Sequence, residues 1–513
     1  MAYFWPLLRP TEPLSLGSDF AAQAYPARRY ITAALFQGRL PHWAPEIAFG
    51  FPLLADIETS AFYPISLLFS LLHGPDLSYR ALELQLMLHH VVGGLGMSLL
   101  LRRVGCLWSG ALCGAVVFGF SGFLWAHGGH LTVVQSASWV PWVLLGGVTL
   151  VDQISAPVLV KTAIALALAI LGGHPQMPFY GGLALLVIGG AGAWRPAARL
   201  PRVGAAVAAA GLLAVGLTAV QLLPTAVLAR HSIRWMPPSG FLQTDALPPE
   251  NLLTLLIPLA YHRTPRWVSV DEFHGYVGIL PLILALWALA HRRTRWTLAF
   301  AILAGMGLVL ATGLPPFHWV AQAGIFRASG RAIYFFDLGI AGLAGLGASA
   351  LLARVMPESV AERRFRRAVW GVAAGASAGA IWLSWRGLPA ALLGEVLSPE
   401  FAFHYRGFVA VLVAAAIVLD AARRWRHKRW LAGGLLVAVL MVETLSFPSS
   451  VGWSGVPPGG WWPSRDRPDA LPRDVGPYRV LNDGLFGRAT TMQANVGLVY
   501  RSEERRVGKE CRL

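Results

Sequence analysis

The sequence predicts an all-α, polytopic membrane protein with about twelve spanning helices. Of its 513 residues, 55% are hydrophobic and only 13% are charged, and the mean hydropathy of +0.55 is higher than that of soluble globular chains. Several stretches, such as 203–223 and 430–447, run for roughly 18 to 21 residues with at most one charge, enough to cross the hydrocarbon core as a helix. The basic residues behind the net charge of +16 lie in short loops between these stretches, a distribution that argues against nucleic-acid binding.

The first 80 residues are apolar and aromatic but contain no stretch long enough to span a membrane. Prolines interrupt this region repeatedly, so helices there must be short. We expect a folded loop whose short helices, including one over 61–73, lie at the membrane interface. The interrupting prolines are Pro6, Pro10, Pro13, Pro26, Pro41, Pro45, Pro52 and Pro64.

The apolar stretches that follow define both the helix count and the orientation. If successive helices alternate in direction, every arginine-rich loop falls on one side, which the positive-inside rule identifies as cytoplasmic. Those loops contain residues 102–103, 195–202, 292–295, 363–367 and 423–429. The predicted spans are 81–101, 106–126, 134–151, 158–172, 178–194, 203–223, 275–290, 296–312, 331–352, 368–385, 405–420 and 430–447.

The sequence divides into four segments. Residues 1–80 form the first extracytoplasmic loop, 81–447 the membrane bundle, and 448–500 the start of a soluble α/β or β domain outside the membrane. The tail 501–513 breaks from the preceding composition and resembles the translation of a sequencing adapter, so we expect it to be non-native. We also expect a further spanning helix before residue 1 and more of the soluble domain after residue 500.

The first loop contains the most distinctive motifs, in the segments 17–26 and 38–64. Asp19, Gln23 and Tyr25-Pro26 are followed by Gly38-x-Leu-Pro-x-Trp, Gly50-x-Pro and Phe-Tyr-Pro ending at Pro64. Further motifs are Gly-Gly-His at 128–130 and Gly-Gly-His-Pro-Gln at 172–176. They are followed by Gly-Tyr-Val-Gly-Ile-Leu-Pro-Leu at 275–282 and Phe-Arg-Ala-Ser-Gly-Arg at 326–331. In this order the motifs resemble the bacterial YfhO family within the GT-C glycosyltransferase superfamily.

This resemblance implies an integral-membrane transferase in the bacterial cytoplasmic membrane, with its active face outside the cytoplasm. It would move a sugar from a polyprenyl-phosphate carrier to a cell-envelope acceptor, which is a glycan polymer, a lipid or a protein. Its partners would be the lipid-linked sugar, the acceptor and membrane lipid. In this superfamily a carboxylate of the first outer loop is the catalytic base, and Asp19 occupies that place; Gln23 and Tyr25 fall in the same motif and are expected to bind substrate.

The chemistry of Asp19 fits this role. Transfer from a sugar phosphate requires a base for the acceptor hydroxyl, but the departing phosphate needs no protonating acid, so one carboxylate suffices. The alternative is that Asp19 only caps a short interfacial helix, because Ser18-Asp19 is also a helix start signal.

A second acidic pair in the loop, Asp56 and Glu58, could orient the acceptor or share a divalent cation. The alternative is a solvated turn or a helix N-terminus. We predict no obligatory cofactor, although a divalent cation is possible.

Arg327 and Arg331 are four residues apart where the loop 313–330 enters a predicted helix, so they share one helix face at the outer boundary. Forked guanidinium donors fit the oxygens of a lipid-linked phosphate. The alternatives are snorkelling at the interface or pairing with Asp337.

Three histidines, His127, His130 and His174, fall in short outer loops. We expect His130 and His174 to hydrogen-bond substrate together with Gln176 and Gln135. Interfacial packing and a zinc site are the alternatives.

Two intramembrane features complete the prediction. Glu443 lies inside the last helix, where a carboxylate is functional or paired with a neighbouring helix. The glycine-rich segment 342–347 indicates close helix packing.

The competing function is a transporter or flippase of lipid-linked sugars, although we detect no internal repeat of the kind that transporters show.

Overall fold

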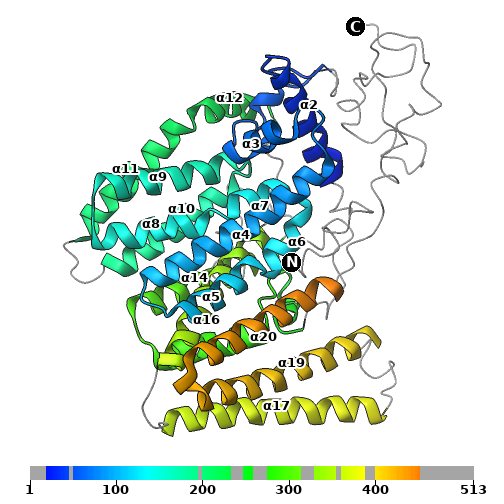
Figure 1. The fold of residues 1–513 in the computed structure, drawn as a ribbon, viewed down its shortest axis with the longest axis vertical. Coiled ribbons are helices and arrows are strands. Elements are labelled where there is room, and N and C mark those ends of the chain that lie inside the picture. Colours follow the sequence, from blue (N-terminus) through cyan, green and yellow to red (C-terminus); the bar gives the residue numbers. More distant parts are fainter. Residues whose placement is uncertain are drawn as a thin grey trace.

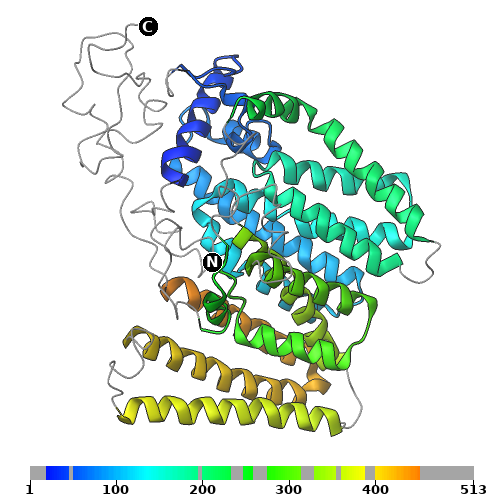
Figure 2. The same cartoon turned by 180° about the vertical axis from the view of Figure 1, so that it is seen from behind.

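The computed structural model describes residues 19–45, 50–193, 199–232, 246–257, 274–312, 329–353, 360–386 and 399–450. In these residues the regular structure is helical, apart from an isolated antiparallel bridge between Ala44 and Phe51. Helices stack side by side, with α2, α3 and α12 at one edge and α17 and α19 at the other (Figure 1; Figure 2 gives the reverse view). The predicted soluble segment lies almost wholly outside the described residues, as does the tail.

The first loop contains short helices, as predicted. Proline at the second position of α2 (Tyr25–Phe36) and at the first position of α3 (Pro64–His73) suits a helix start, where a backbone N–H is not needed. Between them lie two 3₁₀ turns, Leu53–Ala55 and Ile57–Thr59. The helix predicted over 61–73 is confirmed, beginning three residues later.

Each predicted span falls on a helix or a pair of helices. Eight helical runs are long and apolar enough to cross a membrane within the described residues; the chain is a multi-pass membrane protein. These runs are Tyr79–Arg103, Trp108–Gly129, Leu131–Asp152, Gln176–Ala193, Leu200–Leu217, Arg295–Thr312, Ser329–Ala353 and Tyr405–Arg424. The helices involved are α4 (Tyr79–Arg103), α5 (Trp108–Gly119), α6 (Gly122–Ala126), α7 (Leu131–Ala137), α8 (Val140–Asp152), α10 (Gln176–Ala193), α11 (Leu200–Leu217), α14 (Arg295–Thr312), α16 (Ile333–Ala353) and α19 (Pro399–Arg424).

The remaining predicted spans are helices α9 (Ala156–Leu171), α13 (Ile279–His291), α17 (Val360–Arg386) and α20 (Arg429–Ser450). The span predicted over 203–223 is not continuous. It ends at Leu217, and a separate helix, α12 (Ala219–Arg230), follows. Gln221 and Thr225 of α12 donate hydrogen bonds of 3.0 and 2.7 Å to the carbonyls of Leu54 and Ala55. These hydrogen bonds hold α12 against the first loop.

The central helix of the bundle is α16, whose candidate span is completely buried. It packs against α5, α13 and α14. A Cβ on Gly347 would overlap the carbonyl oxygen of Leu284, and a Cβ on Gly342 would overlap the ring of Phe300. The predicted close packing of segment 342–347 is therefore confirmed, because only hydrogen fits at these positions.

Gly347→Ala is expected to destabilise the protein by about 1 to 3 kcal/mol, because the new methyl group must displace helix backbone. The measurement is the thermal unfolding midpoint in detergent, with Gly305→Ala as control. Gly305 lies inside α14 with nothing within 4 Å of its added Cβ. An unchanged midpoint for Gly347→Ala would contradict this packing.

Two of the arginine-rich loops, at 102–103 and 292–295, meet at one end of the bundle. Arg103 and Arg295 bind the two oxygens of Asp152 at 2.9 and 3.0 Å, and Arg292 donates to the carbonyl of Gly105. The first loop lies at the other end, because Phe20 contacts Tyr79 at the start of α4, with ring centroids 5.1 Å apart. Twenty-five residues of α4 separate the two ends by about 37 Å at 1.5 Å per residue.

Candidate functional site

Asp19 faces His130 at the end of the bundle that holds the first loop. His130 Nε2 lies 3.2 Å from Asp19 Oδ2, and the two side chains are 20% and 44% exposed. Asp19 precedes the π-helical turn Phe20–Ala24, but its side chain makes no capping hydrogen bond there. The capping alternative is therefore wrong. Asp19 is a partly exposed carboxylate held beside an imidazole.

Two buried carboxylates hold the starts of helices in the bundle. Asp337 of α16 accepts the N–H of Phe123 at 3.1 Å, so it holds the start of α6, the helix that leads into His130. Glu443 of α20 accepts the N–H groups of Ile279 and Leu280 and lies 3.3 Å from the Tyr276 hydroxyl. Glu443 therefore caps α13, which is the pairing with a neighbouring helix that the sequence left open.

Arg331 joins two of the predicted substrate residues. Its Nη1 donates to His174 Nε2 at 3.0 Å and to Gln176 Oε1 at 3.4 Å. Because Nε2 accepts, the proton of a neutral His174 is on Nδ1. Gln176 in turn donates to the Tyr180 hydroxyl at 2.8 Å. These two partners of Arg331 belong to the Gly-Gly-His-Pro-Gln motif, and the Arg331 side chain is buried.

Helix α7 connects two clusters, one of Asp19 with His130 and one of Arg331 with His174 and Gln176. His130 immediately precedes α7, and Ser136 near its other end accepts the backbone N–H of His174 at 3.1 Å. Tyr334, three residues after Arg331, donates to the carbonyl of Ala137 at 2.9 Å. Six residues from His130 to Ser136 correspond to about 9 Å along a helix axis. The carboxylate and the guanidinium therefore lie near opposite ends of one short helix.

The first loop docks on this helix through the hydroxyl of Ser60. Ser60 donates to Gln135 of α7 at 3.2 Å and to the carbonyl of Gly172 at 2.9 Å. Arg28 donates to the carbonyls of Thr59 and Ser60, and burial lowers the pKa of Arg28 to about 10. Arg28 therefore stays charged at neutral pH and holds the loop from the side of α2.

A second hydrogen-bonded group anchors the Phe-Tyr-Pro motif. The Tyr63 hydroxyl accepts from Trp139 Nε1 and donates to His89 Nε2, both at 2.7 Å. The direction follows from His89 Nδ1, which donates to the carbonyl of Gln85. Burial raises the pKa of Tyr63, so the hydroxyl keeps its proton.

Gly173 allows the close approach of the turn and the first loop. Its φ of +105° is one that side chains rarely adopt, and an added Cβ would overlap Ser60 Oγ and lie 2.9 Å from the carbonyl oxygen of Ile57. The Gly-Gly pair before His174 is thus explained by backbone packing.

Gly173→Ala is expected to undock residues 53–60, because the φ value and the added Cβ together cost about 1 to 3 kcal/mol. Hydrogen–deuterium exchange of the backbone amides in this segment should become faster. Gly182→Ala is the control, since nothing lies within 4 Å of its added Cβ in α10. Equal exchange in both variants would contradict the docking role.

The other predicted site residues lie around these clusters. Asp56 accepts the backbone N–H of Glu58 at 3.0 Å and caps a 3₁₀ turn, which is the helix N-terminus that the sequence left as an alternative. Glu58 and Gln23 are exposed. Tyr25 packs edge-on against Tyr79, with ring centroids 5.3 Å apart.

The histidines do not form a metal centre. His127 stacks on Phe123, with ring centroids 4.1 Å apart, while His130 and His174 belong to different clusters. No group of three or more His, Cys, Asp or Glu suited to a metal occurs in the part of the chain that the structure describes. Arg327 lies outside the described residues.

Sequence reasoning missed several residues of the site. Tyr63 was part of a motif but had no assigned role, and Arg28 and Ser136 were not singled out. Arg28 carried a usable signal, since an arginine in a short apolar helix needs a partner. Ser136 carried none, because its role depends on the distant turn.

No protein-family model and no curated protein sequence matches the chain. Among solved structures, the chain is similar to ArnT from Cupriavidus metallidurans bound to undecaprenyl phosphate, with a TM-score of 0.51, 15% identity and coverage of 99% of this chain and 84% of ArnT. ArnT in the apo state gives a TM-score of 0.49 at 14% identity, covering 98% of this chain and 82% of ArnT. The Archaeoglobus fulgidus oligosaccharyltransferase gives 0.37 at 13% identity, covering 85% and 54%. The chain therefore has a fold similar to that of ArnT.

Proposed function

We propose that this protein is an integral-membrane glycosyltransferase that moves a sugar from a polyprenyl-phosphate carrier to a cell-envelope acceptor. The observation that carries the proposal is the pair of clusters at the two ends of α7, with Asp19 and His130 at one end and Arg331 with His174 and Gln176 at the other. The ArnT-like fold and the sequence resemblance to the YfhO family support it. We place the protein in the bacterial cytoplasmic membrane with these clusters on the outer side.

Asp19 is the proposed base. Its Oδ2 is held by His130, and its other oxygen takes the proton from the acceptor hydroxyl. The acceptor oxygen then bonds to the anomeric carbon of the sugar while the bond from that carbon to the phosphate oxygen breaks. The phosphate leaves with the electron pair and remains on the polyprenyl carrier, so the step requires no second carboxylic acid.

Arg331 is the proposed phosphate ligand. His174 and Gln176 hold its Nη1, which orients the planar guanidinium and reduces the entropy lost when it binds phosphate. A buried, forked donor is well suited to phosphate oxygens. Arg327, four residues earlier, is proposed to assist it.

The proposed sugar site lies along α7, between the two clusters. Gln135 projects from this helix, and its Nε2 is buried without a hydrogen-bond partner among the described residues. An unpaired buried donor is costly unless a ligand satisfies it, so we assign it to a sugar hydroxyl. Gln23, Tyr25, Asp56 and Glu58 are proposed to contact the acceptor.

The test separates transfer from translocation. The full chain is reconstituted in liposomes with a panel of undecaprenyl-phosphate-linked radiolabelled sugars and a cell-envelope extract as the acceptor source. A transferase releases free undecaprenyl phosphate and moves the label into a fraction without the lipid. Movement of the label across the bilayer while it stays on its lipid would instead establish a flippase and overturn the proposal.

A further inference from the structure

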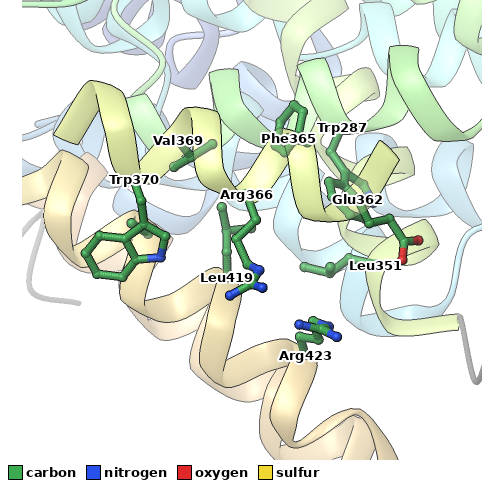
Figure 3. A pocket seen from close by; sticks show the side chains of 10 residues that line it. Trp287, Leu351, Glu362, Phe365, Arg366, Val369, Trp370, Leu419 and Arg423 are labelled. Atoms are coloured by element: carbon green, nitrogen blue, oxygen red, sulfur yellow. The ribbon is translucent and has the colours of Figure 1, made fainter. Parts of the chain in front are cut away.

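A groove lies among α13, α16, α17 and α19, away from the site described above (Figure 3). Its walls are apolar and include Leu351, Phe365, Val369 and Leu419. Trp287 closes it on the side of α13, with its ring centroid 5.2 Å from that of Phe365. The groove thus separates part of α17 from the central bundle.

The groove belongs to the basic end of the bundle. Phe365 contacts His291 at the end of α13, and His291 adjoins Arg292, which binds the carbonyl of Gly105. Arg331 and Leu351 lie near opposite ends of the run Ser329–Ala353. Twenty residues of helix separate them by about 30 Å at 1.5 Å per residue, so a ligand in the groove cannot reach the Asp19 site.

Two arginines line the groove beside its apolar walls. Arg366 is in the second turn of α17, and Arg423 is in the last turn of α19. Arg366 lies 3.5 Å from Asp420, and Glu362 also lines the groove. Further arginines surround it on the same two helix ends, so positive charge is in excess: Arg363, Arg364, Arg367 and Arg424.

Exposed tryptophans mark the same level of the bundle. Trp370, Trp425 and Trp430 are 36%, 47% and 75% exposed, and they lie in or beside the basic ends of α17, α19 and α20. Tryptophan collects at the headgroup level of a bilayer. Apolar walls, arginines and interfacial aromatics therefore occur together at this end of the bundle.

We propose that this groove binds an anionic phospholipid such as phosphatidylglycerol. One acyl chain lies along Leu351, Val369 and Leu419, and the phosphate is bound by Arg366 and Arg423. Basic pockets between membrane helices bind anionic headgroups in this way, and guanidinium groups pair with phosphate oxygens by forked hydrogen bonds. The excess of arginine over Glu362 and Asp420 favours an anionic over a zwitterionic lipid.

Native mass spectrometry of the full chain in detergent tests this proposal with phosphatidylglycerol and phosphatidylethanolamine of identical acyl chains. We expect preferential retention of phosphatidylglycerol, and a loss of about tenfold in its affinity in Arg366→Gln/Arg423→Gln. Arg363→Gln/Arg424→Gln removes the same charge from exposed positions outside the groove and should retain the lipid. Leu419→Trp, which fills the groove without changing charge, should also lose it.

Three results would overturn the proposal. The first is equal retention of the two lipids. The second is an equal loss in both double-arginine variants, which would indicate only a diffuse surface charge. The third is a dimer mass that Leu419→Trp abolishes, because a second copy of the chain would then occupy the groove. Binding of undecaprenyl phosphate should be unchanged in all these variants, since Arg331 lies at the other end.

Discussion

Asp19→Asn is expected to lower the rate of sugar transfer by about 10² to 10⁴-fold, the usual contribution of a general base. Asparagine keeps the size of the side chain and an oxygen that can accept from His130, but it cannot take a proton from the acceptor. The protein should reach the membrane in normal amounts, because the Asp19 side chain caps no helix. The measurement is the initial rate of label transfer in liposomes at equal protein content.

Asp76→Asn is the matched control. Asp76 is also a carboxylate of the first loop, but its side chain is 88% exposed and lies 3.4 Å from Arg29 at the surface. Such exposed pairs contribute little to stability, so this variant should transfer at the wild-type rate. A near-normal rate in Asp19→Asn, or equal losses in both variants, would remove Asp19 from the role of base.

Arg331→Gln is expected to weaken binding of undecaprenyl phosphate by about 10- to 100-fold, because hydrogen bonds to charged groups contribute about 1.5 to 3 kcal/mol. Glutamine retains a donor for His174 but loses the charge and the forked geometry. Binding is measured by native mass spectrometry with undecaprenyl phosphate itself. Arg331→Lys should lose less affinity than Arg331→Gln.

Arg29→Gln serves as the control for the loss of one positive charge, because Arg29 lies in α2 at the same end and pairs only loosely with Asp76 at 3.4 Å. The unfolding midpoint of each variant is measured in parallel, since Arg331 is buried and its loss removes contacts with His174 and Gln176. Retained lipid affinity in a folded Arg331→Gln protein would show that the phosphate binds elsewhere.

Hydropathy predicted the helices well because each span is a long apolar run. The span expected over 296–312 is observed at Arg295–Thr312, and that over 331–352 at Ile333–Ala353. The break after Leu217 was not predicted, since 203–223 contains no charge. That break coincides with hydrogen bonds from Gln221 and Thr225 to a distant loop, and hydropathy cannot register such contacts.

The individual site residues were easier to predict than their pairings. His174 and Arg331 stood out by residue type and context, yet they are 157 positions apart, and only the fold brings them together. Glu443 is a residue with partners in the backbone. Its carboxylate was expected to be functional or paired, and it caps α13 by accepting backbone N–H groups. Almost every residue has a backbone N–H group, so the sequence cannot identify which of them bind Glu443.

A cryo-EM structure of the full chain with undecaprenyl phosphate tests the central proposal most directly. We predict phosphate density within hydrogen-bond distance of the Arg331 guanidinium, at the end of α7 opposite the Asp19–His130 pair. The Asp19 carboxylate should then point toward the bound phosphate. Phosphate density at another place, for example beside Arg366 and Arg423, with none at Arg331, would contradict the proposed site.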